Sequence, residues 1–233
     1  MIERYTRPEM GHLWSLENEW QTILNVEIAA CEAMAELGEI PAEAAENIKK
    51  NAKFDVARIC EIEKTTDHDI IAFLTNLEEN VGADSKYIHK GLTSSDVKDT
   101  AYCILMRDAA GLILAGLHEL RTVLRRRADE FRHTPCIGRT HGIHAEPMTF
   151  GLKLLLWSAE IERDIERLTR AQKTVAVGKL SGAVGTYSNI DMRIEEITCK
   201  KLGLTPVPLA TQVIQRDRHA ELVTTLAIIA GTM

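Results

Sequence analysis

The sequence predicts an all-α protein, in which a small N-terminal helical domain is followed by part of a long-helix bundle domain. Apolar residues recur at steps of three or four along most of the chain, which is the period of an amphipathic helix. The segment from Ser95 to about Arg132 keeps this period without a proline, and a helix of that length is typical of bundles. Strand patterns are nearly absent, and aromatic residues make up only 5% of the chain, so a sheet is not expected. We place the domain boundary after residue 93, which gives domains 1–93 and 94–233, the second truncated at its C-terminal side.

The N-terminal domain is predicted to be a series of short helices after one longer helix. Apolar residues are spaced by three or four from Leu13 to Leu37. Gly38 is typical of a helix C-terminus, and Pro41 suits the first turn of the next helix. Further helices are expected over residues 42–51, 55–62 and 69–79.

Two long helices follow in the predicted bundle domain. Asp96 and Asp99 lie at the start of the first, where the helix dipole favours negative charge, and Pro135 ends it. The second runs from about residue 148 to 177, and its polar side carries opposite charges four residues apart, such as Glu166 and Arg170.

The C-terminal part is predicted to contain a glycine-rich loop over 178–186, a helix over 192–202 and an apolar helix over 216–233. The last helix has neither a cap nor a basic last turn, although terminal carbonyl groups need partners. We therefore expect the chain to be a fragment cut inside a bundle. A stop codon directly after codon 233 would contradict this expectation.

Composition excludes several classes of protein. The chain is 45% hydrophobic and 27% charged, which indicates a globular rather than a disordered protein. Its net charge of −6 gives no indication of nucleic-acid binding. The N-terminus lacks an apolar signal region, and the longest apolar runs, 111–117 and 154–157, are too short to cross a bilayer. Five widely separated cysteines without a C-x-x-C pair are typical of reduced thiols in a cytoplasmic protein.

The densest cluster of polar residues lies between the two long helices, over residues 138–147, where Gly and Pro predict an irregular connection. His141 could act there as a general acid or base, because histidine side chains titrate near neutrality. The alternative is a connector whose histidines satisfy helix-end carbonyl groups, and the residues alone leave both interpretations equally open. A metal site of His141, His144 and Glu146 is disfavoured, because Gly142 and Pro147 break the continuous helix that such ligands use.

Two further segments combine helix capping with possible chemistry. Residues 65–69 read Thr-Thr-Asp-His-Asp, in which Asp67 or Thr66 could cap the next helix while His68 serves catalysis. Residues 88–96 lie before the first long helix and combine His89, hydroxyl groups and helix-start amides, as an anion site does, although Ser-Ser-Asp is also ordinary capping sequence. The glycine loop at 178–186 does not match a nucleotide-hydrolase P-loop. The remaining histidines are interpreted as surface or packing residues: His12, His118, His133 and His219.

Five motifs carry a resemblance that covers the chain from Arg4 onwards. They are TTDHD at 65–69, KGLTSSDV at 90–97, GRTHGIHAEP at 138–147, SGAVGT at 181–186 and TQVIQRD at 211–217. Together they resemble the fumarase/aspartase superfamily and, within it, the adenylosuccinate lyase family. The motifs TSSD and GRTHG-x-HAEP at this spacing favour that family over the argininosuccinate lyases.

The resemblance implies β-elimination of fumarate from adenylosuccinate, which gives AMP, and from the succinyl-carboxamide ribotide of purine synthesis, which gives AICAR. It implies that His141 protonates the leaving nitrogen with help from His68, and that no metal or cofactor takes part. Stabilising the carbanion-like intermediate needs preorganised hydrogen-bond donors, which helix-start amides and hydroxyl groups provide. The implied substrate-binding residues are Arg4, Tyr5, Asp67, His68, Asp69, Thr93, Ser94 and Gln212. Arg4, Tyr5 and Gln212 carry no signal of their own.

The resemblance also implies a cytoplasmic homotetramer whose sites combine three chains, with a purine nucleotide as substrate and neither nucleic acid nor membrane as partner. The family's flexible serine loop, G-S-S-x-M-P-x-K-x-N-P, does not occur in residues 1–233, so this chain alone is expected to be inactive. Two alternatives come from other classes: a metal-dependent hydrolase using His141, His144 and Glu146, and a non-catalytic helical scaffold. Neither explains why His68, Thr93–Ser94 and His141 all lie beside predicted helix ends.

Overall fold

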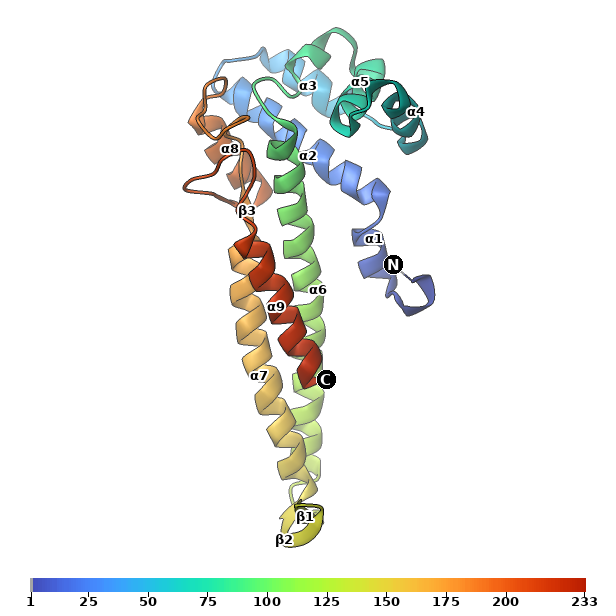
Figure 1. The fold of residues 1–233 in the computed structure, drawn as a ribbon, viewed down its shortest axis with the longest axis vertical. Coiled ribbons are helices and arrows are strands. Elements are labelled where there is room, and N and C mark those ends of the chain that lie inside the picture. Colours follow the sequence, from blue (N-terminus) through green and yellow to red (C-terminus); the bar gives the residue numbers. More distant parts are fainter. Residues whose placement is uncertain (1) are drawn as a thin grey trace. The chain divides into compact units, whose positions relative to one another are not determined.

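The fold is predominantly helical, as predicted (Figure 1). The computed structural model describes residues 2–233. The α-helices are α1 (Pro8–Leu13), α2 (Leu16–Glu36), α3 (Ala42–Asn51), α4 (Val56–Thr66), α5 (Asp69–Val81), α6 (Ser94–Glu130), α7 (Phe150–Val175), α8 (Met192–Leu202) and α9 (Asp217–Thr232). Short 3-10 helices are η1 (Glu3–Tyr5) and η2 (Gly82–Tyr87). The strands are β1 (Pro135–Thr140), β2 (Ile143–Thr149), β3 (Val177–Gly178) and β4 (Thr205–Pro206).

The chain forms two compact units. The first unit contains the residues up to Asp108 together with Val175–Arg216, and the second contains Ala109–Thr174 with Asp217–Met233. The boundary between the two compact units therefore lies within α6, between Asp108 and Ala109, whereas the predicted domain boundary lies just before α6. The physical reason is that Val97 and Ala101, near the start of α6, are buried in the core of the first unit. The boundary after residue 93 stays a prediction about domains.

The core of the first unit is built around α2, which packs against α3, α4 and α8. Ser15 caps α2, since its Oγ accepts a hydrogen bond from the backbone N–H of Asn18 at 3.2 Å. The buried face of α2 meets α5 through Trp20 and Phe73, whose rings stack with centroids 4.9 Å apart. Phe73 also contacts the ring of Phe54, and its side chain is fully buried. These aromatic contacts fix α5, the helix that begins at Asp69, against the core.

Gly91 lies where the chain turns from η2 into α6 and closely approaches another loop. Its φ is +75°, and a Cβ atom there would come within 2.2 Å of the backbone oxygen of Asn189. We predict that Gly91→Ala lowers the free energy of unfolding by more than about 2 kcal/mol, since left-handed strain alone costs roughly 1–2 kcal/mol. Urea titration of the natural protein and of Gly91→Ala measures this loss of stability. Gly38→Ala is the matched control, because Gly38 has a similar φ of +74° with open space around it. If both variants lose the same free energy of unfolding, the backbone of Asn189 must move away from the new methyl group at no cost, and the predicted clash would be wrong.

The second unit consists of three helical segments and a hairpin, with α7 and α9 alongside the later turns of α6 (Figure 1). Glu162 on α7 pairs with Arg121 at 2.7 Å and with Arg125 at 2.8 Å, and both arginines lie on α6. The rings of Phe131 and Phe150 meet edge to face where α6 and α7 join the hairpin, with centroids 5.3 Å apart.

The segment between α6 and α7 is an antiparallel β-hairpin, so the prediction of an irregular connection is wrong. β1 pairs with β2 from Pro135↔Thr149 to Thr140↔Ile143. The two residues between the strands, His141 and Gly142, have φ values of 53° and 76°. Positive φ at both central residues is the signature of a type I′ turn, whose twist matches that of the flanking strands.

By length and composition alone, α6 is long and apolar enough to cross a membrane. The short apolar runs at 111–117 and 154–157 did not indicate this. Half of the most apolar window of α6 is buried inside the protein. The core helix of a soluble protein passes the same test, so the finding is weak support for a membrane span.

Candidate functional site

The junction of α4 and α5 presents His68 in a fixed orientation. Asp67 ends α4 in a left-handed conformation, with φ 49° and its N–H bonded to the oxygen of Glu63 at 2.8 Å. His68 caps α5 instead, because its Nδ1 accepts a hydrogen bond from the N–H of Ile71 at 3.3 Å. The prediction that Asp67 or Thr66 caps this helix is therefore wrong. Since Nδ1 is the acceptor, the neutral ring carries its proton on Nε2, where it can be donated.

Asp69 is held as a carboxylate beside His68. Its Oδ2 forms an ion pair with Lys98 on α6, and its Oδ1 accepts a hydrogen bond from the N–H of Ile70 at 2.7 Å. Partial burial raises the pKa of Asp69, but the hydrogen bonds from Lys98 and from the N–H of Ile70, together with the nearby positive charge, outweigh burial, and the pKa falls below its ordinary value. Asp69 therefore ties the start of α5 to α6 while ionised.

The start of α6 brings a second predicted segment to His68. The hydroxyl Oγ of Ser94 lies 3.5 Å from Nε2 of His68, although the two residues are 26 positions apart. Thr93 precedes the helix, and the first amides of α6 add donors beside these hydroxyl groups. The structure thus brings Ser94 to His68, with Thr93 directly before Ser94 in the chain.

Asp99 lies in the second turn of α6, and it anchors the segment that contains Gln212. Its Oδ2 accepts hydrogen bonds from the N–H of Ile214 at 2.8 Å and from Arg216 at 3.0 Å, while Oδ1 accepts a second bond from Arg216 at 3.0 Å. Such a bidentate pair fixes both partners in one plane. Gln212 itself is exposed, two residues before this anchor. The helix-start pattern indicates Asp99 only as a complement to the helix dipole, and this contact between distant parts of the chain carries no local sequence signal.

Arg4 and Tyr5 lie on η1 at the N-terminal end of the first unit. The guanidinium of Arg4 stands 4.7 Å from the centroid of the Tyr5 ring, and 73% of Tyr5 is exposed. A cation over an exposed ring leaves both groups free to meet a ligand. Their role in substrate binding stays a prediction from the resemblance.

A buried pair of Glu27 and His89 supports the loop before α6. His89 Nδ1 lies 2.6 Å from Glu27 Oε1, and the N–H of His89 donates to Oε2 at 3.0 Å. The Glu27 side chain is fully buried, and that of His89 is 15% exposed. Burial lowers the pKa of His89, but the hydrogen bond and charge of Glu27 outweigh it, and the pKa is raised above its ordinary value.

This raised pKa predicts a pH-dependent stability. A histidine whose pKa is higher in the folded than in the unfolded protein adds stability that is complete below its unfolded pKa, about 6.5. The contribution is lost as the pH rises through the folded pKa. Urea titrations of the protein between pH 6 and 9 should therefore show falling stability across that interval, and His89→Gln should flatten the fall. An identical fall in His89→Gln would assign the effect to another group.

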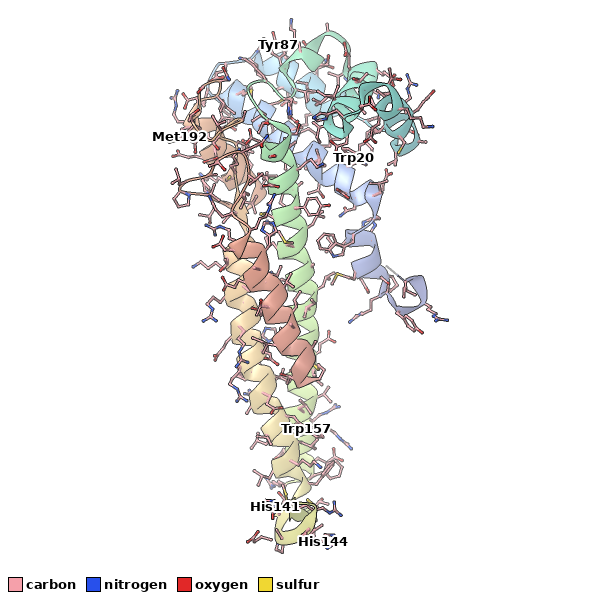
Figure 2. All side chains as sticks on the ribbon, viewed as in Figure 1. Trp20, Tyr87, His141, His144, Trp157 and Met192 are labelled. Atoms are coloured by element: carbon pink, nitrogen blue, oxygen red, sulfur yellow. The ribbon has the colours of Figure 1, made fainter. Side chains whose placement is uncertain are left out.

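His141 occupies the turn of the β1–β2 hairpin, and His144 lies on β2 of the same hairpin (Figure 2). His144 Nε2 is 3.4 Å from Arg139 Nη2. The hairpin belongs to the second unit and His68 to the first, so the predicted catalytic pair is divided between the two units. Within residues 2–233, no group of three or more His, Cys, Asp or Glu side chains is arranged to hold a metal ion.

The fold and these motifs are those of a family of helical lyases, and comparison with known proteins agrees. A family model described as "Lyase" matches residues 3–233, and the chain belongs to this lyase family. The resemblance inferred from the motifs is thereby confirmed. Among solved structures, a fumarate lyase from Mesorhizobium sp. superposes with a TM-score of 0.88 at 30% identity, covering 96% of this chain and 54% of that one. A β-carboxy-cis,cis-muconate cycloisomerase from Acinetobacter calcoaceticus gives a TM-score of 0.88 at 28% identity, covering 97% and 55%.

Curated relatives carry one particular name. The chain is 55% identical over all 233 residues to the adenylosuccinate lyase of Synechocystis sp.. It is 51% identical over the same length to the adenylosuccinate lyase of Bacillus subtilis. Each alignment covers 54% of the relative, so the chain spans about half the length of the curated relatives it matches.

Proposed function

We propose that the chain supplies the N-terminal half of an adenylosuccinate lyase. The intact enzyme would eliminate fumarate from adenylosuccinate to leave AMP, and from the succinyl-carboxamide ribotide to leave AICAR. The observation that carries the proposal is 55% and 51% identity, without a break in coverage, to two enzymes of that name. The cluster of His68 and Ser94, with Oγ and Nε2 3.5 Å apart, agrees with binding of an anionic substrate.

The proposed elimination needs a base, an acid and donors for a carboxylate that gains charge. His141 is the proposed acid toward the leaving nitrogen, with His68 assisting. Thr93 and Ser94, with the first amides of α6, are the proposed donors that stabilise the carbanion-like intermediate. The other proposed substrate contacts are Arg4, Tyr5, Asp67, Asp69 and Gln212.

The proposed base lies on a serine loop that residues 1–233 do not contain, and we propose that this chain alone is inactive. We also propose that the intact cytoplasmic enzyme is a homotetramer whose chains complete one another's sites, which would bring His141 of one chain to His68 of another. Four large apolar side chains of α7 are exposed and suit burial against another copy: Leu152, Leu155, Leu156 and Trp157. Light scattering that gives a monomer mass for the intact enzyme would contradict this assembly.

The proposed activity is tested by fumarate release from adenylosuccinate, comparing the gene product extended to its natural stop codon with the 233-residue chain. We expect release by the extended protein alone. Absence of release from both would contradict the proposal. Release from argininosuccinate instead would indicate a sister lyase, and stoichiometric metal with chelator-sensitive hydrolysis would indicate the metal-dependent alternative.

A further inference from the structure

We propose that the buried residues Asp96 and Lys179 are positioning residues of this site, which clamp the glycine loop of residues 178–186 to the start of α6 and thereby place the hydroxyl groups of Thr93 and Ser94. The inference rests on the proposed function. It assigns a role to two charged residues that the proposed mechanism does not use.

The two side chains form a closed network with the loop. Lys179 Nζ lies 2.5 Å from Asp96 Oδ1, and neither side chain has any exposed surface. Lys179 Nζ also donates to the backbone oxygen of Gly182 at 2.8 Å. The N–H of Gly182 in turn donates to Asp96 Oδ2 at 3.1 Å. The ammonium group, the carboxylate and both polar backbone groups of Gly182 are therefore engaged with one another.

The same carboxylate fixes the residue before α6. Asp96 Oδ2 accepts a hydrogen bond from the N–H of Thr93 at 2.9 Å, while the N–H of Asp96 donates to the oxygen of Thr93 at 2.8 Å. The first of these bonds is one half of a capping box, in which a side chain in the first turn accepts from the N–H before the helix. The second joins two backbone groups and closes a turn at the helix start. Ser94 follows directly as the first residue of α6, with its Oγ 3.5 Å from His68. The position of both proposed binding hydroxyl groups thus depends on Asp96.

The charge pair is not required merely to attach the loop. The backbone of Lys179 is held separately by the Oγ1 of Thr100, which accepts from its N–H at 3.0 Å and donates to its oxygen at 3.1 Å. The N–H of Leu180 donates to Glu195 at 2.6 Å. Thr100 and Glu195 therefore already hold the backbone of the loop. What the buried ion pair adds is a connection from the loop, through Asp96, to the N–H of Thr93.

Energetics point the same way. Desolvation of a buried ion pair cancels most of its attraction, so neutral residues of similar volume would stabilise the fold about as well. A carboxylate, however, offers about four acceptor sites, which Asp96 uses for donors from three residues in two segments of chain. The pair is therefore better explained by the geometry it imposes than by stability. Lys179, with its ammonium fully buried, is not the cation that meets the substrate.

The test uses the full-length enzyme with three variants: Asp96→Asn, Lys179→Met and the double variant that carries both. Each single change leaves one buried charge unpaired, so we expect lower thermal midpoints for both. The double variant removes both charges and should regain much of the lost stability. We expect its kcat/KM for adenylosuccinate to stay about 10–100-fold below that of the natural enzyme, mainly through a raised KM, because Thr93 and Ser94 are displaced.

The outcomes separate a positioning role from a structural one. A double variant with natural stability and natural kcat/KM overturns the inference. If the double variant does not fold, Asp96→Glu decides, since it keeps the charge but shifts the carboxylate by one methylene. A raised KM then supports the inference, and a natural KM overturns it. Ile48→Ala, a fully buried change on α3 away from this network, is the control for lost stability alone. Failure of the proposed function is distinguished by absence of fumarate release from the natural enzyme itself.

Discussion

Replacing His141 by asparagine in the full-length enzyme is expected to lower kcat about 10²–10⁴-fold, the usual contribution of a general acid. This loss corresponds to roughly 3–5 kcal/mol in the activation barrier. Asparagine suits the position because His141 has a φ of 53°, and asparagine tolerates that left-handed region better than alanine does. The variant therefore removes the proton donor while preserving the hairpin turn. Steady-state fumarate release from adenylosuccinate measures the effect.

His144→Asn is the matched control for that variant. It makes the same change two residues beyond the turn, on strand β2 of the same exposed hairpin. We expect turnover within a few-fold of the natural enzyme, because the proposed mechanism does not use His144. Comparable losses in both variants would favour the metal-dependent alternative, in which both histidines are ligands. Near-natural turnover of His141→Asn would remove His141 from the mechanism.

Helices with local start and stop signals were predictable from the sequence. The helix predicted over 192–202 has those bounds in the structure, since Asp191 caps it and Gly203 follows in a left-handed conformation. The predicted bounds of α6 and α7 differ from the observed ones by only one or two residues at each end. The hairpin between them was missed because His141–Gly142 stands where Asn-Gly or Asp-Gly would have signalled a two-residue turn.

The candidate site was only partly predictable. His68 and Ser94 stood out because capping residues and titratable groups occur together beside helix starts. The pair of Asp96 and Lys179 did not, because its members are 83 residues apart and a single lysine in a glycine loop normally indicates exposure. Gln212 was named through the resemblance alone. Its segment is anchored through Ile214, whose N–H donates to Asp99 115 positions away in the sequence. Such pairings are set by tertiary packing, which periodicity does not encode.

Phe73→Ala is expected to lower the free energy of unfolding by about 3–5 kcal/mol, the range for removing a buried aromatic ring. Phe73 is fully buried, stacks on Trp20 and contacts Phe54, so a truncated side chain leaves a cavity that these rings cannot easily fill. Urea titration of the full-length enzyme, followed by near-ultraviolet circular dichroism, measures the loss. Phe73→Leu keeps more of the buried volume and should lose less.

The same variant links the core to the site, because Phe73 is one turn along the helix that His68 caps. If the aromatic stack holds α5 in place, Phe73→Ala should also raise KM for adenylosuccinate under conditions where the protein is still folded. The reason is that His68 and Ser94 are only 3.5 Å apart and belong to different helix starts, so a small shift of α5 separates them. A large loss of stability with an unchanged KM would show instead that Asp69 and its ion pair with Lys98 suffice to hold the start of α5 against α6.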